Sequence, residues 1–105
     1  MDQRINSRVL NNHLFIGNLT DATLDTSLQY CDGQSSIRTL RGREEMEVGH
    51  LTSASPFTTR ILGNVLFVKN GVKTDITVLL TLGTGTKINC LLRDGEEKKF
   101  VEVTV

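Results

Sequence analysis

Residues 72–82 read Val-Lys-Thr-Asp-Ile-Thr-Val-Leu-Leu-Thr-Leu, and this stretch decides the class of fold. Every second residue from Val72 to Leu82 falls on one face, and all of these except Thr74 are apolar. The opposite face is polar except at Leu79. A period of two is typical of a β-strand with one face on a core and the other in water. The stretch therefore predicts a half-buried strand.

Shorter apolar runs on either side are separated by residues that favour tight turns. The chain has nine glycines and one proline, and the pairs 11–12, 70–71 and 94–95 are Asn-Asn, Asn-Gly and Asp-Gly, which suit two-residue turns. We expect strands within residues 5–9, 14–19, 24–30, 62–69 and 72–82, two short strands or one bent strand at 37–40 and 45–48, and a hairpin that joins 87–93 to 100–105. We identify no internal repeat. The fold class predicted is all-β: a small, strongly bent antiparallel sheet or barrel of five to seven strands with little or no helix.

Composition argues against several functional classes. The 105 residues suit a single domain, 1–105, and the 12 basic and 12 acidic residues leave none of the positive excess usual in nucleic-acid binders. No apolar run reaches the ~20 residues that cross a membrane. Residues 1–4 open without an apolar signal segment, so we expect an intracellular protein, cytoplasmic or nuclear, with Cys31 and Cys90 reduced.

No residue pattern indicates catalysis. His13 and His50 are the only histidines and lack the spacing of a metal-binding pair. Cys90 lies in an alternating strand pattern typical of a buried structural thiol, and Asp32 beside Cys31 disfavours a reactive thiolate there. Residues 83–86 are Gly-Thr-Gly-Thr, but the Gly-Lys-Ser/Thr of a phosphate loop does not follow and no helix pattern begins there. We expect no enzyme activity, no metal site and no cofactor.

Two segments resemble the motifs of the Sm and Sm-like family. Residues 11–19 match the first motif at Phe15, Gly17 and Leu19, and residues 62–67, Leu-Gly-Asn-Val-Leu-Phe, are similar to the second. The resemblance covers about residues 4–76. It implies a bent barrel over residues 4–82, with residues 87–105 as a C-terminal hairpin extension, of a kind that assembles edge to edge and usually binds uridine-rich RNA.

The residues that would hold a base in this family are replaced. Ser27 stands where an Asn would contact the base, and Val68-Lys69 stands where an Arg-Gly pair would stack on it. The resemblance implies Phe15, Ser27 and Lys69 as candidate RNA contacts, and we expect the isolated chain to bind RNA only weakly. Gly17 and Gly63 are predicted bends in the strands.

These observations predict a non-catalytic scaffold subunit that pairs through edge strands with other proteins in an RNA-associated complex, as a homo- or hetero-oligomer. Leu66, Val68 and Leu79 are the candidate interface residues, because they lie in the most apolar segments and Leu79 interrupts a polar face. The alternative is a β-rich structural or accessory protein, such as a viral one, that assembles with itself.

Overall fold

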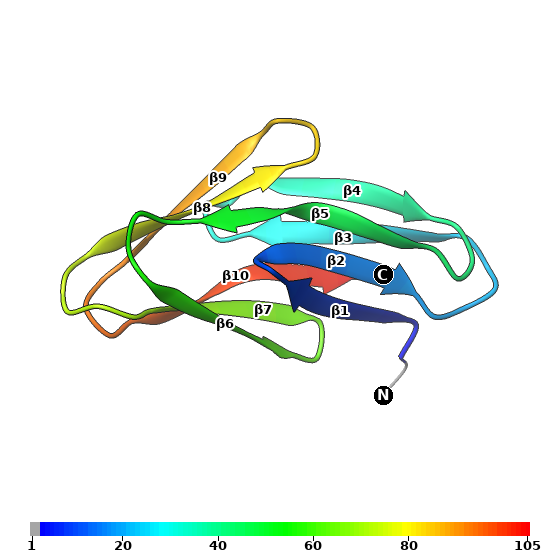
Figure 1. Cartoon of the computed structure of the whole chain (residues 1–105). Coiled ribbons are helices and arrows are strands. Elements are labelled where there is room, and N and C mark those ends of the chain that lie inside the picture. The colour runs from blue at the N-terminus through cyan, green and yellow to red at the C-terminus, as the bar shows by residue number, and fades with distance from the viewer. Residues whose placement is uncertain (1–2) are drawn as a thin grey trace.

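The computed structural model describes residues 3–105, and these form ten β-strands and no helix (Figure 1). The predicted all-β class is confirmed, although the strands outnumber the five to seven expected. They are β1 (Ile5–Leu10), β2 (His13–Asn18), β3 (Leu24–Tyr30), β4 (Ser35–Leu40), β5 (Glu45–Thr52), β6 (Phe57–Leu62), β7 (Val65–Asn70), β8 (Ile76–Leu82), β9 (Lys87–Leu92) and β10 (Glu97–Thr104).

The strands form two antiparallel sheets that do not close into a barrel. Sheet A has the order β1-β2-β5-β8-β9 and sheet B the order β4-β3-β10-β7-β6. Side chains from both sheets make one buried cluster between them. Alternation along each strand turns one set of side chains inward, as in residues 24–30, where Leu24, Thr26, Leu28 and Tyr30 are buried.

The molecule is built from two structural repeats, which the sequence alone did not reveal. Each strand from β1 to β5 has a counterpart of the same length, β6 to β10, that begins 52 residues later. We call residues 5–52 repeat 1 and residues 57–104 repeat 2; residues 53–56 link them. When each strand of sheet A is replaced by its counterpart, the order becomes β6-β7-β10-β3-β4. This is the order of sheet B read from its other edge. The two repeats are therefore related by a pseudo-two-fold rotation.

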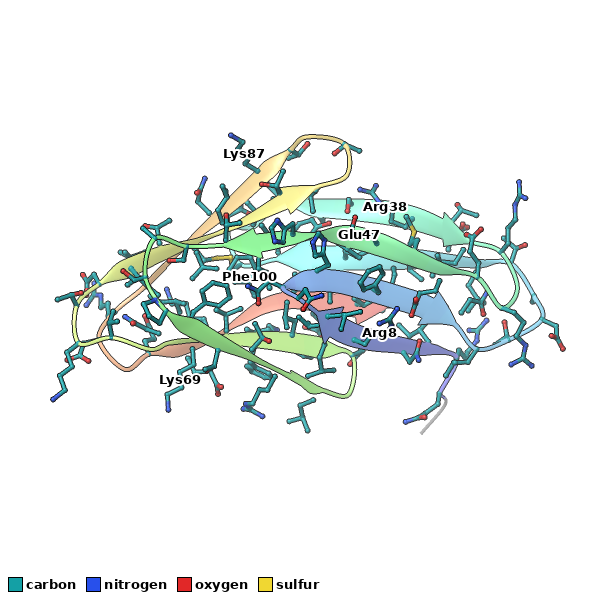
Figure 2. The ribbon with its side chains drawn as sticks, in the orientation of Figure 1. Arg8, Arg38, Glu47, Lys69, Lys87 and Phe100 are labelled. Carbon is teal, nitrogen blue, oxygen red and sulfur yellow. A yellow bond between two sulfur atoms is a disulfide. The ribbon has the colours of Figure 1, made fainter. Side chains whose placement is uncertain are left out.

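Irregular details follow the same repeat. The pairing of β2 with β5 skips Val48, and the pairing of β7 with β10 skips Phe100, which is 52 residues further on. Each skipped residue is a β-bulge, and both side chains are buried (Figure 2 shows the Phe100 ring inside the sandwich). Bulges at equivalent places turn two successive residues of the central strand toward the core.

Two buried asparagines hold the chain where it crosses between the sheets. The Asn18 side-chain amide donates hydrogen bonds to the carbonyls of Ala22, Leu40 and Arg41 at 2.7, 3.1 and 3.0 Å. Its counterpart Asn70 does the same to Thr74, Leu92 and Arg93 at 2.8, 3.1 and 2.9 Å. Each amide thus joins the end of one strand to the chain at the end of another.

The local turn predictions had mixed outcomes. Asn11 and Asn12 form the expected tight turn between β1 and β2, with φ of 51° and 65°. Asn70-Gly71 is not a hairpin turn, because β7 lies in sheet B and β8 in sheet A. The expected hairpin of residues 87–105 does not form either: β9 pairs with β8, whereas β10 pairs with β3 and β7. In both places the turn carries the chain to the other sheet.

Candidate binding surface

The predicted RNA contacts do not form one patch. Phe15 lies on the outer face of sheet A, on a strand that buries Leu14 and Ile16. Ser27 and Lys69 lie on the outer face of sheet B, where they pair with opposite ends of β10, at Thr104 and Glu97. Figure 2 shows Lys69 pointing into solvent. No single ligand site joins these three residues.

Two of the predicted interface residues face the core. Leu66 is 2% exposed and Val68 is not exposed at all, so the prediction that their side chains contact a partner is wrong. Both belong to β7, an inner strand between β10 and β6. Leu79 is half-buried on the outer face of β8, between Thr52 and Asn89 of the neighbouring strands. It remains a candidate for contact with another molecule.

The two candidate bends have different settings. Gly63 has a φ of 63° in the turn between β6 and β7, a conformation that glycine adopts without strain. Gly17 lies in β2, where an added Cβ would meet the Asn6 side chain. Lys69 occupies the position equivalent to Gly17 in repeat 2. The fold therefore does not need a glycine at this place in both repeats.

An Arg–Phe–Glu cluster spans three strands on each outer face. In sheet A the Arg8 guanidinium lies 4.5 Å from the Phe15 ring centroid and donates two hydrogen bonds, of 2.8 and 2.7 Å, to Glu45. In sheet B the counterparts Arg60, Phe67 and Glu97 repeat this with 4.5 Å to the ring and two bonds of 2.9 Å. The hydrogen bonds lower the pKa of each carboxyl. Each cluster ties an outermost strand to its neighbours.

The outer faces differ beside this shared cluster. On sheet A, His13 stacks on His50 with ring centroids 4.2 Å apart, and Glu47 accepts a hydrogen bond from His13. At the equivalent positions sheet B has Val65, Glu102 and Lys99, and it has Ser27 in place of Leu79. The two repeats therefore share the Arg–Phe–Glu cluster but differ in the exposed residues beside it.

The outermost strands of the sheets stand out by their exposed apolar side chains. Within the described residues, β1 and β9 of sheet A and β4 and β6 of sheet B each pair on one side only. Each carries one large apolar residue that is about half exposed or more: Leu10 at 53%, Leu91 at 49%, Ile37 at 71% and Leu62 at 62%. The sequence does not identify these strands as edges, because an edge position depends on the topology.

The edges of β4 and β9 differ in charge at one inward position. Arg38 of β4 is half-buried and lies on the same side of the strand as the buried Leu40, between the exposed Ile37 and Thr39, and inward charges of this kind oppose edge-to-edge pairing. The equivalent residue of β9 is Cys90, which forms a disulfide with Cys31; their Cα atoms are 6.3 Å apart. The expectation of two reduced cysteines is therefore wrong. The bond joins repeat 1 to repeat 2.

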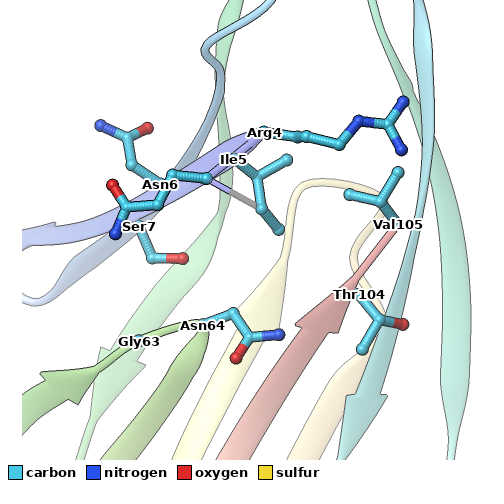
Figure 3. A pocket seen from close by; sticks show the side chains of 9 residues that line it. Arg4, Ile5, Asn6, Ser7, Gly63, Asn64, Thr104 and Val105 are labelled. Atoms are coloured by element: carbon cyan, nitrogen blue, oxygen red, sulfur yellow. The ribbon is translucent and has the colours of Figure 1, made fainter. Parts of the chain in front are cut away.

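A pocket of about 510 Å³ lies where the two ends of the described chain meet (Figure 3). It is lined by Gln3 to Ser7, by the β6–β7 turn at Gly63 and Asn64, and by Thr104 and Val105. The Ser7 hydroxyl is buried there and has no hydrogen-bond partner. At the equivalent place in the other half of the molecule, the linker 53–56 connects β5 to β6.

Comparison with protein-family models, with curated proteins and with solved structures finds no match. Among residues 3–105, no three His, Cys, Asp or Glu side chains are placed to hold a metal ion. The same residues include no helix that is long and apolar enough to cross a membrane.

Proposed function

We propose that the protein is a non-catalytic structural subunit that assembles with other copies of itself, with the β9 edge of sheet A as the main contact. The observation that carries the proposal is the exposed apolar residue on each outermost strand. Such strands present unpaired N–H and C=O groups, which another strand can satisfy. The β1 and β6 edges lie against each other. Of the other two edges, β9 is favoured because it lacks the inward charge that β4 has in Arg38.

A second copy suits the β9 edge because the contact would be self-complementary. In β9 the residues Ile88, Cys90 and Leu92 face inward, and Lys87, Asn89 and Leu91 face outward. Two such strands that run antiparallel about a two-fold axis can place like faces together. The exposed Leu91 side chains of the two copies would then add apolar contact beside the backbone pairing.

The disulfide supports a structural role. Cross-links of this kind persist in oxidising surroundings, which include virion surfaces and the extracellular space. The expectation of reduced cysteines followed from the expected intracellular location, so a disulfide between Cys31 and Cys90 counts against that location. An assembly of small sandwiches also gains stability from a covalent bond between repeats, since a domain of this size buries a limited core.

The RNA-associated role stays a prediction that only the resemblance to the Sm family supports. The two segments that carry this resemblance occupy equivalent places in the two repeats, since Leu10 to Phe15 and Leu62 to Phe67 are 52 residues apart. The internal repeat is therefore a reason, separate from any Sm relationship, why these two segments resemble each other. Binding of oligouridine to the purified chain, followed by fluorescence anisotropy, tests this role separately.

The experiment for self-assembly is sedimentation equilibrium over a range of concentrations. We expect the native chain to associate, and Leu91→Lys to weaken the association by more than about tenfold, or about 1.4 kcal/mol. The control is Thr77→Lys: Thr77 is the exposed residue opposite Leu91 on the inner strand β8. A native chain that stays monomeric at all concentrations, or equal effects of the two variants, would refute the proposal.

A further inference from the structure

The two repeats are interlocked, and each sheet contains strands of both. Sheet A takes β1, β2 and β5 from repeat 1 and β8 and β9 from repeat 2, while sheet B has the reverse composition. The joining pairs are β5 with β8 and β10 with β3. A repeat by itself would leave the inner strands β5 and β3 unpaired along one side and its half of the core uncovered. Each repeat therefore needs another repeat to complete its fold.

The strand pairing from repeat 1 to repeat 2 is the same as that in the opposite direction. Thr52 pairs with Leu79 at one joint, and their counterparts Thr104 and Ser27 pair at the other. At the far end of these joints, Gly49 pairs with Leu82, and Val101 pairs with Tyr30. The two joints therefore have the same strand register. A complementary repeat is recognised by its strands, whichever chain it belongs to.

Within one chain, the continuous connection between the repeats is the linker 53–56, Ser-Ala-Ser-Pro. It leads from β5 in sheet A to β6 in sheet B. Packed sheets lie ~10 Å apart, and a chain spans at most ~3.6 Å per residue. The five steps from Thr52 to Phe57 reach about 18 Å, which is enough, whereas two steps would reach only about 7 Å.

We propose that the contact between the repeats is also a site for a second copy of this chain: repeat 1 of one molecule takes up repeat 2 of another, with the linker as the hinge. Two molecules that exchange repeats in this way form a closed dimer with the same strand pairs as the monomer. The exchange does not rest on pairing through β9, so Leu91→Lys leaves it unchanged. In the exchanged dimer, the Cys31–Cys90 bond joins two different chains.

The bond between repeats supplies a direct test with the full-length chain. We would mix equal amounts of Cys31→Ser and Cys90→Ser variants in urea with reductant, refold them at ~1 mM, near the effective concentration set by a short linker, and add glutathione disulfide. Oxidation of one thiol on each chain forms the bond, and the two electrons and two protons reduce glutathione disulfide to two thiols. Mass tags distinguish the variants.

We expect a covalent dimer that contains one chain of each variant, because Cys31 of one and Cys90 of the other become neighbours only after exchange. Each variant refolded alone should give at least about tenfold less covalent dimer, a ratio that corresponds to about 1.4 kcal/mol. If the mixed dimer does not form, or if the single-variant samples give as much covalent dimer, the proposal is overturned.

Shortening the linker is a second, independent test. Deletion of residues 53–55 leaves two steps between Thr52 and Phe57, too few to join the sheets within one chain. We expect this variant to fold as a dimer with twice the native mass, while insertion of three Gly or Ser residues at the same place leaves a monomer under the same dilute conditions. A deletion variant that folds as a monomer, or that does not fold at all, would contradict the exchange of repeats.

Discussion

The buried amides of Asn18 and Asn70 allow one stability measurement to be made twice in the same molecule. Replacing either residue with alanine removes an amide that donates to three backbone carbonyls. In each set the bond to one carbonyl, Leu40 or Leu92, is buried, and the other two are partly open to water. A buried polar group without a partner costs about 1–3 kcal/mol, and the water-accessible carbonyls add less.

We therefore expect Asn18→Ala and Asn70→Ala each to lower the free energy of unfolding by about 2–3 kcal/mol. Urea unfolding followed by far-ultraviolet circular dichroism suits a chain with no tryptophan and one tyrosine. Asn89→Ala, on the exposed side of β9, is the control and should stay within about 0.5 kcal/mol of the native value. A loss below about 0.5 kcal/mol at either amide, or a difference above about 1.5 kcal/mol between them, would refute the equivalence of the two sites.

Three further predictions concern the disulfide, the outer face and pH. Replacing Cys31 and Cys90 with serine should lower the unfolding free energy by about 4 kcal/mol in urea titrations, because the bond closes a loop with a sequence separation of 59; no change would mean that the bond does not form. Leu79→Lys should leave the monomer folded by circular dichroism, since Leu79 lies on an outer face; if the variant unfolds, Leu79 belongs to the core. Because Arg8 and Arg60 lower the pKa of Glu45 and Glu97, stability from these pairs should be full above pH 4.5 and fall as the pH drops through the lowered values. Urea midpoints of the two Glu→Gln variants should depend less on pH in that range, and a profile equal to that of the native chain would contradict this.

The alternation of residues 72–82 was enough to predict strands, but not how the strands are shared between sheets. Asn70-Gly71 and Asp94-Gly95 favour a tight turn through their own backbone preferences. Whether such a turn joins neighbours in one sheet or carries the chain to the other depends on distant contacts. This is why the expected hairpin of residues 87–105 was wrong while the turn at Asn11-Asn12 was right.

The repeat and the disulfide were missed for related reasons. The two repeats differ at most of their aligned positions, and several of the matches are leucines, which occur throughout a β-rich chain; the informative matches include Arg8 with Arg60, Phe15 with Phe67 and Asn18 with Asn70. The spacing of two cysteines does not show which strands lie over one another. The apolar character of residues 62–69 predicts an interface at Leu66 and Val68, but it does not distinguish an edge strand from an inner one, and β7 is an inner strand.

The pocket where the ends of the described chain meet has a consequence for the order of the strands. Thr104 and Ile5 are the counterparts of Thr52 and Phe57, which the four linker residues connect. Joining Val105 directly to residue 2 would place four residues in the same gap. A circularly permuted gene that encodes residues 57–105 followed by 2–52 therefore specifies the same succession of strand pairs. In this architecture the strands form a cycle, and the break in the chain could stand at either of two equivalent places.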